Sequence, residues 1–215
     1  MWLGRPSCIL ALSGQRQGEE HPTASSWWSD LVANEVPHRV DNEGLSTLRI
    51  LSLEALLDDE GLARGFKSVG QTKGVSVGFS PASSFREHIS TYRLPTAEFD
   101  YINFTGMEYV GRDVHLVRSA DAVITVGGRM GSLHELSTAL ESRKVCGILL
   151  GSGGLADYTI TLLKNVWAPG AKDVIYDANP ERLVARVIEA LDKKYADVEH
   201  DSSDPQVSTK RYGQG

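Results

Sequence analysis

The stretch Ile124-Thr-Val-Gly-Gly-Arg-Met-Gly-Ser-Leu-His-Glu135 decides the fold of this chain. An apolar run meets three glycines, and a Ser-x-x-Glu pair then opens a helical pattern. This order predicts a strand, a tight turn and a helix N-terminus. The N–H groups of a helix's first turn attract anions, and glycines let the backbone approach a ligand closely. We therefore expect a ligand site to be centred on this turn.

Apolar runs alternate with helical patterns from Lys73 onward. This rhythm predicts a Rossmann-like α/β fold, a parallel sheet with helices on both faces. The predicted strands cover residues 48–51, 74–79, 100–104, 121–126, 145–150 and 173–176. The predicted helices cover residues 112–119, 132–143, 156–167 and 180–195, and another runs through Ala55, Leu62 and Phe66.

The composition predicts a poorly structured N-terminal arm over residues 1–45, a Rossmann-like domain over 46–196 and a disordered tail over 197–215. Residues 13–44 are rich in Gly, Ser, Glu, Gln and Asn and show almost no apolar period. The tail is polar and equally aperiodic. Such segments bury too little apolar surface to offset the entropy of ordering.

Charge and cysteine content narrow the function classes. The net charge of −6 and the pI of about 5.5 argue against nucleic-acid or anionic-membrane partners, which are bound through clustered Lys and Arg. Cys8 and Cys146 lie too far apart in the sequence to indicate a disulfide framework or a four-ligand zinc site. The apolar stretch 8–12 is shorter than a secretory signal, and no run approaches the ~20 residues of a membrane span. We expect a cytoplasmic protein.

The Ser-x-x-Glu pair has a purely structural interpretation. Ser132 at the N-cap and Glu135 at the third helical position would form a capping box without any ligand. A helix that needs only a cap does not require Gly-Gly-Arg-Met-Gly at the carboxyl end of a strand, where α/β sheets bind ligands. Neither a Walker motif nor the spaced dinucleotide fingerprint is present in this turn. The pattern therefore favours a phosphate site that is neither a P-loop nor a nicotinamide site.

The segment from Gly74 to Leu191 resembles the lysine-decarboxylase-like or Lonely Guy (LOG) family of Rossmann-like nucleotide-binding proteins, part of the SLOG superfamily. Their signature is a Gly-Gly-x-Gly-Thr-x-x-Glu loop, preceded by an arginine-led helix and a Ser-Asp-Ala strand entry. The counterparts here are Arg112, Ser119 to Ala122, Gly127, Gly128, Gly131, Ser132 and Glu135.

The resemblance implies a phosphoribohydrolase, which cleaves a nucleoside 5′-monophosphate to the free base and ribose 5-phosphate. It implies a homodimer and no metal or organic cofactor. N-glycosidic cleavage builds positive charge on the ribose, which a carboxylate stabilises, and Glu135 is the candidate. Arg112 is the candidate for binding phosphate or assisting the departing base, although an ion pair with Asp113 or Glu108 would also explain it. The predicted binding residues are Gly127, Gly128, Arg129, Gly131 and Ser132.

Two departures from the family pattern favour an alternative. Two residues, Arg129 and Met130, separate the glycine pair from Gly131, where the pattern has one. The second Gly-rich turn that helps form the family's pocket shows only Gly61 in the region where we expect it. The alternative is a non-catalytic binder or carrier of a nucleotide or a molybdopterin-like phosphorylated ligand. A purely structural subunit is a third hypothesis.

Two further segments bear on the site. Residues 80–99 form a long polar connection, typical of a lid or binding loop, in which His88, Tyr92 and Arg93 are candidates to face a ligand. A lone loop histidine is more often solvated. The glycines of residues 151–154 either meet a ligand or only turn the chain.

Overall fold

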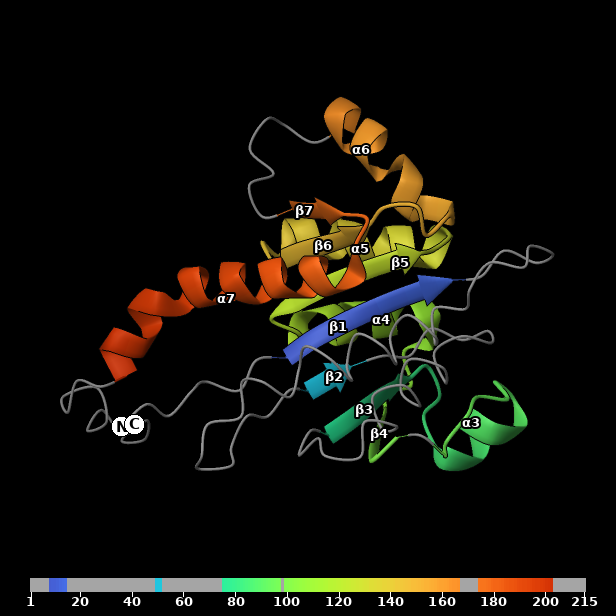
Figure 1. The fold of residues 1–215 in the computed structure, drawn as a ribbon. Coiled ribbons are helices and arrows are strands. Elements are labelled where there is room, and N and C mark those ends of the chain that lie inside the picture. Colours follow the sequence, from blue (N-terminus) through green and yellow to red (C-terminus); the bar gives the residue numbers. More distant parts are fainter. Residues whose placement is uncertain (1–7, 15–48, 52–74, 98, 167–173, 203–215) are drawn as a thin grey trace.

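The computed structural model describes residues 8–14, 49–51, 75–97, 99–166 and 174–202. In these residues seven strands form one parallel sheet in the order β4-β3-β2-β1-β5-β6-β7 (Figure 1). The strands are β1 Cys8–Gly14, β2 Arg49–Leu51, β3 Val75–Ser80, β4 Tyr101–Phe104, β5 Ala122–Gly127, β6 Val145–Leu149 and β7 Val174–Asp177. The helices are α3 Phe85–Ser90, α4 Glu108–Ser119, α5 Met130–Glu141, α6 Gly154–Val166 and α7 Pro180–Ser202.

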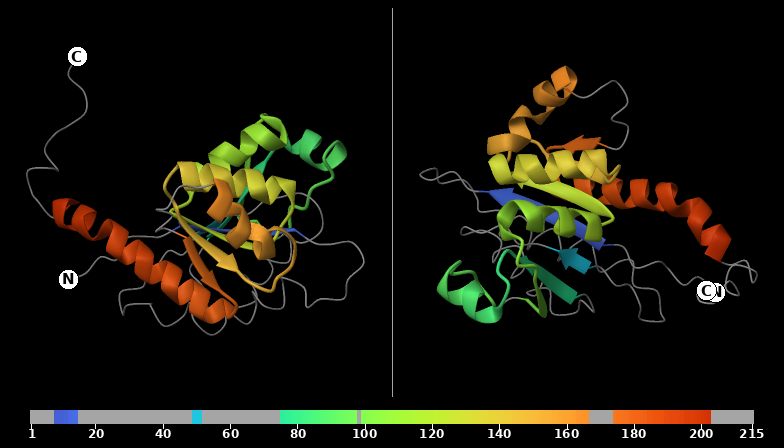
Figure 2. Two further views of the ribbon diagram at one scale, coloured as in Figure 1. Left: turned by 90° about the horizontal axis from the view of Figure 1, so that it is seen from above. Right: turned by 180° about the vertical axis from the view of Figure 1, so that it is seen from behind.

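Helices cover both faces of the sheet, which confirms the predicted Rossmann-like α/β class (Figure 2). On one face α7 packs Leu183, Val187 and Leu191 against β5 and β6. On the other, α4, α5 and α6 share a core with β3, β5 and β6. Strands β5 and β6 are buried along their whole length, because parallel strands between two helical layers have no solvated face. These two strands were the clearest apolar runs in the sequence.

The predicted strands and helices from residue 74 onward are present, with shifted ends. Helix α4 begins at Glu108 rather than at 112, since its exposed first turn carries no apolar period. Helix α7 continues to Ser202, seven residues past the predicted end at 195, into the segment predicted as a disordered tail. Extension of an existing helix needs no new nucleus, so polar residues can prolong it. The predicted helix through Ala55, Leu62 and Phe66 lies outside the described residues.

Strand β1 was not among the predicted elements. Residues 8–14 fall in the predicted arm, yet they lie between β2 and β5 and pair in parallel with both. A central strand of a parallel sheet need not alternate apolar and polar residues, and its partners lie far away in the sequence. The chain therefore builds β2, β3 and β4 on one side of β1, and β5, β6 and β7 on the other. The division into arm, domain and tail stays a prediction.

The connection over residues 80–99 contains helix α3, which was not among the predicted helices. Ser84 caps α3 by accepting the Glu87 N–H (3.3 Å), and the Glu87 carboxylate accepts the Ser83 N–H (2.8 Å) and hydroxyl (2.6 Å). These hydrogen bonds lower the pKa of Glu87. The Ser-x-x-Glu spacing at 84–87 was a readable start signal for the helix.

His88 is fully buried in α3, so it is not the solvated loop histidine that was expected. Its Nδ1 lies 2.9 Å from Ser80 Oγ and its Nε2 lies 3.1 Å from the Pro95 carbonyl oxygen. Both ring nitrogens are therefore used to hold the connection together. His88 has a structural role here.

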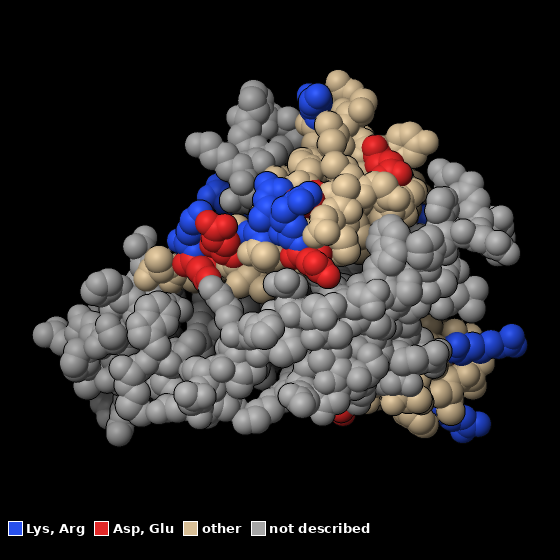
Figure 3. All heavy atoms as spheres, viewed as in Figure 1, with Lys and Arg blue, Asp and Glu red and all other residues tan. Residues whose placement is uncertain are grey.

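Charges of both signs mix on the face covered by α7 (Figure 3). Asp177 accepts bonds from Arg182 Nε (2.7 Å) and Nη2 (2.6 Å), and Arg186 Nη1 lies 3.2 Å away. The hydrogen bond from Arg182 contributes most to lowering the pKa of Asp177 far below its usual range. Farther along α7, Lys193 pairs with Glu189 at 2.6 Å. On this face Arg182, Arg186 and Lys193 thus each have an acidic partner. Within the described residues, no helix is both long and apolar enough to cross a membrane.

Candidate functional site: the turn between β5 and α5

The strand order of the sheet reverses between β1 and β5: β2 to β4 follow on one side of β1, and β5 to β7 on the other. The neighbouring strands β1 and β5 are in register to their ends, where Gly14 pairs with Gly127. In parallel α/β sheets, the crevice outside the carboxyl ends of the strands at such a switch point holds the ligand. Strand β1 lies on one side of this switch point and β5 on the other. The Gly-rich turn that we expected around Gly61 lies outside the described residues.

The turn after β5 requires its two glycines. Gly127 and Gly128 adopt left-handed backbone angles, with φ of 63° and 96°. A Cβ on Gly128 would lie 2.8 Å from the Ser132 Cβ, closer than real side chains approach. Only glycine combines this conformation with this contact. At Gly128 the backbone thus comes close to the Ser132 side chain, and the predicted approach to a ligand stays a prediction.

Helix α5 begins without a side-chain cap. Its N-cap is Arg129, which has an extended backbone and makes no side-chain cap bond, and its first turn holds no acidic residue. The first intrahelical bond runs from the Leu133 N–H to the Arg129 carbonyl (2.9 Å), so the N–H groups of residues 130–132 precede the helical ladder. Because Ser132 is the third helical residue, the capping-box interpretation of Ser132 and Glu135 is wrong. A helix start of this kind suits an anion.

The neighbouring turn over residues 151–154 braces this one. The Leu155 N–H donates to the Gly128 carbonyl oxygen (2.9 Å), and the Gly127 N–H donates to Ser152 Oγ (2.7 Å). A Cβ on Gly154 would lie 2.4 Å from the Gly128 carbonyl oxygen, so this glycine allows the two turns to touch. These contacts support the interpretation that the second turn directs the chain and fixes the first.

Arg112 is buried, with 1% of its surface exposed. Its Nε lies 3.2 Å from Asp113 Oδ1, and Asp113 Oδ2 lies 2.8 Å from His134 Nδ1 on α5. The expected ion pair with Asp113 is therefore present, and it lies in the interior of the protein. Within the part of the chain that the structure describes, Arg112 Nη1 has no hydrogen-bond partner. A buried guanidinium with an unused donor is suited to a bound anion.

The remaining predicted residues occupy two environments. Ser132 and Glu135 are fully buried on one side of α5, whereas Arg129 is exposed at the start of the helix. The Asp113–His134 contact joins α4, which carries Arg112, to α5, which carries Glu135. In the described residues, no group of three or more His, Cys, Asp or Glu side chains is placed to hold a metal ion. The chemistry available here is anion binding, with a buried carboxylate one turn along the helix.

Sequence reasoning missed Tyr92 and Tyr109 as neighbours. Their ring centroids lie 5.5 Å apart at an interplanar angle of 82°, and Arg112 Cζ lies 6.0 Å from the Tyr109 ring. Burial raises the pKa of Tyr109, against the opposing effect of Arg112. The sequence signalled only that residue 92 lies in a long connection that faces the site.

These features define the class: a Rossmann-like α/β protein whose switch point carries a glycine turn and an uncapped helix. The model of the SLOG cluster4 family matches residues 60–184, and the chain belongs to this family. The predicted resemblance to the SLOG superfamily is thereby confirmed. A comparison with curated proteins gives no match.

Solved structures share the fold. The structural-genomics protein TM1055 superposes with a TM-score of 0.64 at 18% identity, covering 86% of this chain and 99% of its own. The molybdenum cofactor binding protein from the phototrophic bacterium Rippkaea orientalis gives 0.63 at 19% identity, with coverage of 87% and 98%. The molybdenum cofactor carrier protein of Chlamydomonas reinhardtii gives 0.61 at 18%, also with coverage of 87% and 98%. At this identity the likeness establishes the architecture.

Proposed function

We propose that this protein binds a phosphorylated small molecule, a nucleoside monophosphate or a molybdopterin-like compound, at the turn between β5 and α5. One observation carries the proposal: α5 starts at the switch point of the sheet with neither a side-chain cap nor an acidic residue in its first turn. Family membership supports it, and two proteins of the same fold are described as molybdenum cofactor binding or carrier proteins.

The phosphate would be held by the backbone of residues 128–132. Gly128 turns the chain into the helix start with a left-handed backbone, and the helix dipole attracts negative charge there. Arg129 adds an exposed cation at the N-cap, and the buried Arg112 adds a donor from α4. Backbone N–H groups and guanidinium donors together provide the charge-assisted hydrogen bonds by which proteins hold phosphate.

Titration calorimetry with AMP, GMP, ribose 5-phosphate and molybdopterin tests the proposal. We expect saturable binding of at least one of them that weakens as salt rises, since an exposed cation and a helix dipole are screened. Arg129→Gln removes the exposed cation without disturbing the core, and should weaken binding by about threefold to tenfold. Arg118→Gln is the matched control, because Arg118 is an exposed arginine in the last turn of α4. No saturable binding of any of the four compounds would refute the proposal.

A second candidate function is hydrolysis of the N-glycosidic bond of a nucleoside monophosphate. The fully buried Glu135, one turn from the glycine turn, favours it, because a desolvated carboxylate stabilises positive charge on a ribose strongly. Chromatography of AMP reactions should then reveal free adenine and ribose 5-phosphate. Glu135→Gln should lower kcat by about 10²-fold or more and leave AMP affinity within about threefold. AMP bound without release of adenine would establish a binder instead of a hydrolase.

We also propose a homodimer. The outer side of α4 and the start of α5 expose the apolar side chains of Val110 (68%), Val114 (38%) and Met130 (77%). Exposed apolar side chains on these two helices favour a protein partner, and a second copy is the simplest. Light scattering after size-exclusion chromatography should give twice the chain mass of 23.4 kDa. Val110→Asp should then yield monomers, whereas a monomeric wild-type protein would rule out the dimer. The cytoplasmic location stays a prediction.

A further inference from the structure

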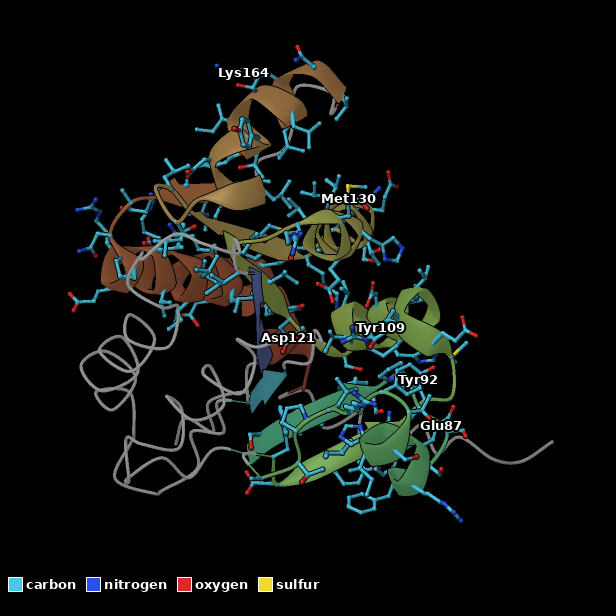
Figure 4. All side chains as sticks on the ribbon, turned by 90° about the vertical axis from the view of Figure 1, so that its right-hand side faces the viewer. Glu87, Tyr92, Tyr109, Asp121, Met130 and Lys164 are labelled. Atoms are coloured by element: carbon cyan, nitrogen blue, oxygen red, sulfur yellow. The ribbon has the colours of Figure 1, made fainter. Side chains whose placement is uncertain are left out.

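Tyr92 and Tyr109 lie at the ligand-binding edge of the sheet. Helices α3 and α4 follow the carboxyl ends of β3 and β4, just as α5 follows that of β5. Tyr109 is in the first turn of α4, and Tyr92 comes shortly after α3. Figure 4 views this edge and labels the two tyrosines beside each other, with Met130 above them on α5. Both rings are thus on the same edge as the proposed phosphate site.

Tyr109 keeps a large uncovered surface although it has two ring contacts. It is 41% exposed, while Tyr92 contacts it edge-on and the buried Arg112 lies near its ring. Arg112 also carries the buried Nη1 that has no hydrogen-bond partner in the described residues. The exposed part of the Tyr109 ring therefore lies near the buried Arg112 guanidinium, whose Nη1 is available as a hydrogen-bond donor. A phosphorylated compound with a flat ring has the matching groups: an anion for the arginine and a π-face for the tyrosine.

The backbone holds both tyrosines in place. Arg93 and Glu108, the residues next to them, adopt left-handed conformations with φ of 53° and 54°. Non-glycine residues adopt this conformation at a cost, and such strain concentrates at ligand sites. The Glu108 N–H donates to the Pro81 carbonyl oxygen (3.2 Å), and the Tyr92 N–H donates to the Glu87 carbonyl oxygen (3.2 Å). The two segments are thereby tied to the connection that follows β3.

We propose that Tyr109, positioned by Tyr92, is the stacking surface for the planar heterocycle of the ligand. The inference rests on the proposed binding function and adds the part of the site that recognises the ring. A purine and a pterin share the chemistry that Tyr109 reads, a flat electron-poor π-face, so the inference names that shared ring. Base stacking on an aromatic side chain tolerates different rings for the same reason.

The test compares ligands with and without a ring. Binding of AMP, a pterin monophosphate and ribose 5-phosphate is measured by calorimetry for the wild type, Tyr109→Ala and Tyr109→Phe. We expect Tyr109→Ala to lower the affinity for at least one of the two ring compounds by about tenfold and to leave ribose 5-phosphate binding unchanged. Tyr109→Phe keeps the ring and should restore the affinity. The ring compound that loses more identifies the source of the heterocycle.

Tyr101→Ala is the matched control. Tyr101 is a more exposed tyrosine (60%) that begins β4 and therefore lies at the opposite, amino edge of the sheet. Its removal should change no affinity. Retained binding of ribose 5-phosphate by Tyr109→Ala shows that the variant is folded.

Three outcomes would overturn the inference. Equal losses for ribose 5-phosphate and the ring compounds would mean that Tyr109 acts only through Arg112. Unchanged affinity of Tyr109→Ala for AMP and for the pterin compound would mean that neither ring stacks there; the proposed function would still stand. Failure of the wild type to bind any of the three compounds would remove the proposed function together with the inference.

Discussion

Two glycine-rich turns touch at the carboxyl edge of the sheet, and they satisfy their backbone groups differently. In the turn between β6 and α6, the Asp157 carboxylate accepts the N–H groups of Gly151 (2.7 Å) and Gly153 (3.1 Å). In the turn between β5 and α5, the N-cap Arg129 makes no side-chain cap bond and the first helical turn holds no acidic residue. One turn contains its own anion, whereas the other has none.

The comparison teaches that glycine content does not by itself identify a phosphate site. Both turns are left-handed at two or more glycines, so both allow the backbone to come close to another group. What separates them is the internal acceptor. A carboxylate at a helix start performs the same electrostatic task as a bound phosphate, and a turn that already has one gains little from the other.

The largest expected effect comes from placing a methyl group on each turn. Gly128→Ala puts a Cβ 2.8 Å from Ser132 and strains a residue with φ of 96°. We expect it to reduce AMP affinity by about tenfold or more and the free energy of unfolding by roughly 1–3 kcal/mol. Calorimetry and denaturant titration measure the two quantities.

Gly151→Ala is the matched control for that change. Gly151 is also left-handed, with φ of 77°, but a Cβ there meets no atom within 4 Å. The variant should lose roughly 1 kcal/mol of stability through backbone strain alone and keep its AMP affinity. If Gly151→Ala weakened binding as much as Gly128→Ala, the distinction between the two turns would collapse.

A smaller effect is expected from adding a carboxylate to the turn between β5 and α5, which has none. Met130→Asp places a carboxylate in the first turn of α5 at a position that is 77% exposed. The charge should stabilise the helix start by about 0.3–1 kcal/mol and compete with the ligand phosphate, lowering AMP affinity by about fivefold at low salt. Met130→Asn has nearly the same shape without the charge and should bind AMP normally. Tighter binding by Met130→Asp would contradict an anion at this site.

The same two turns show what could be predicted from sequence. The turn after β5 was recognised because its strand is a buried apolar run and its glycines stand before a helical pattern, all within one short segment. The start of the helix after this turn was predicted at residue 132, two residues late, because Ser132 and Glu135 have the spacing of a capping box. The hydrogen bonds of Asp157 depend on how one loop folds back on itself, and composition does not reveal them.

Contacts between distant segments account for the other differences. Strand β1 shows no alternation of apolar and polar residues, and it becomes a strand because β2 and β5 pair with it. The pair of Arg112 with Asp113 was foreseen, but its burial follows from the packing of α4 on α5. Tyr92 and Tyr109 meet because α3 and α4 start at the same edge of the sheet. Pairing and packing of this kind are properties of the assembled sheet, whereas local patterns report single elements.

The smallest effect on binding is expected from removing the carboxylate of the turn between β6 and α6. Asp157→Ala removes the acceptor of the Gly151 and Gly153 N–H groups, which should cost about 1 kcal/mol of unfolding free energy, as for other helix-start caps. AMP affinity should stay within about twofold, because the contact that braces the binding turn is a backbone bond from Leu155 to Gly128 and does not involve Asp157. Calorimetry and thermal unfolding of the same sample separate the two effects. A loss of AMP affinity comparable to that of Gly128→Ala would make the second turn part of the binding site. The contrast between the two turns would then reflect a shared site rather than one open and one self-sufficient helix start.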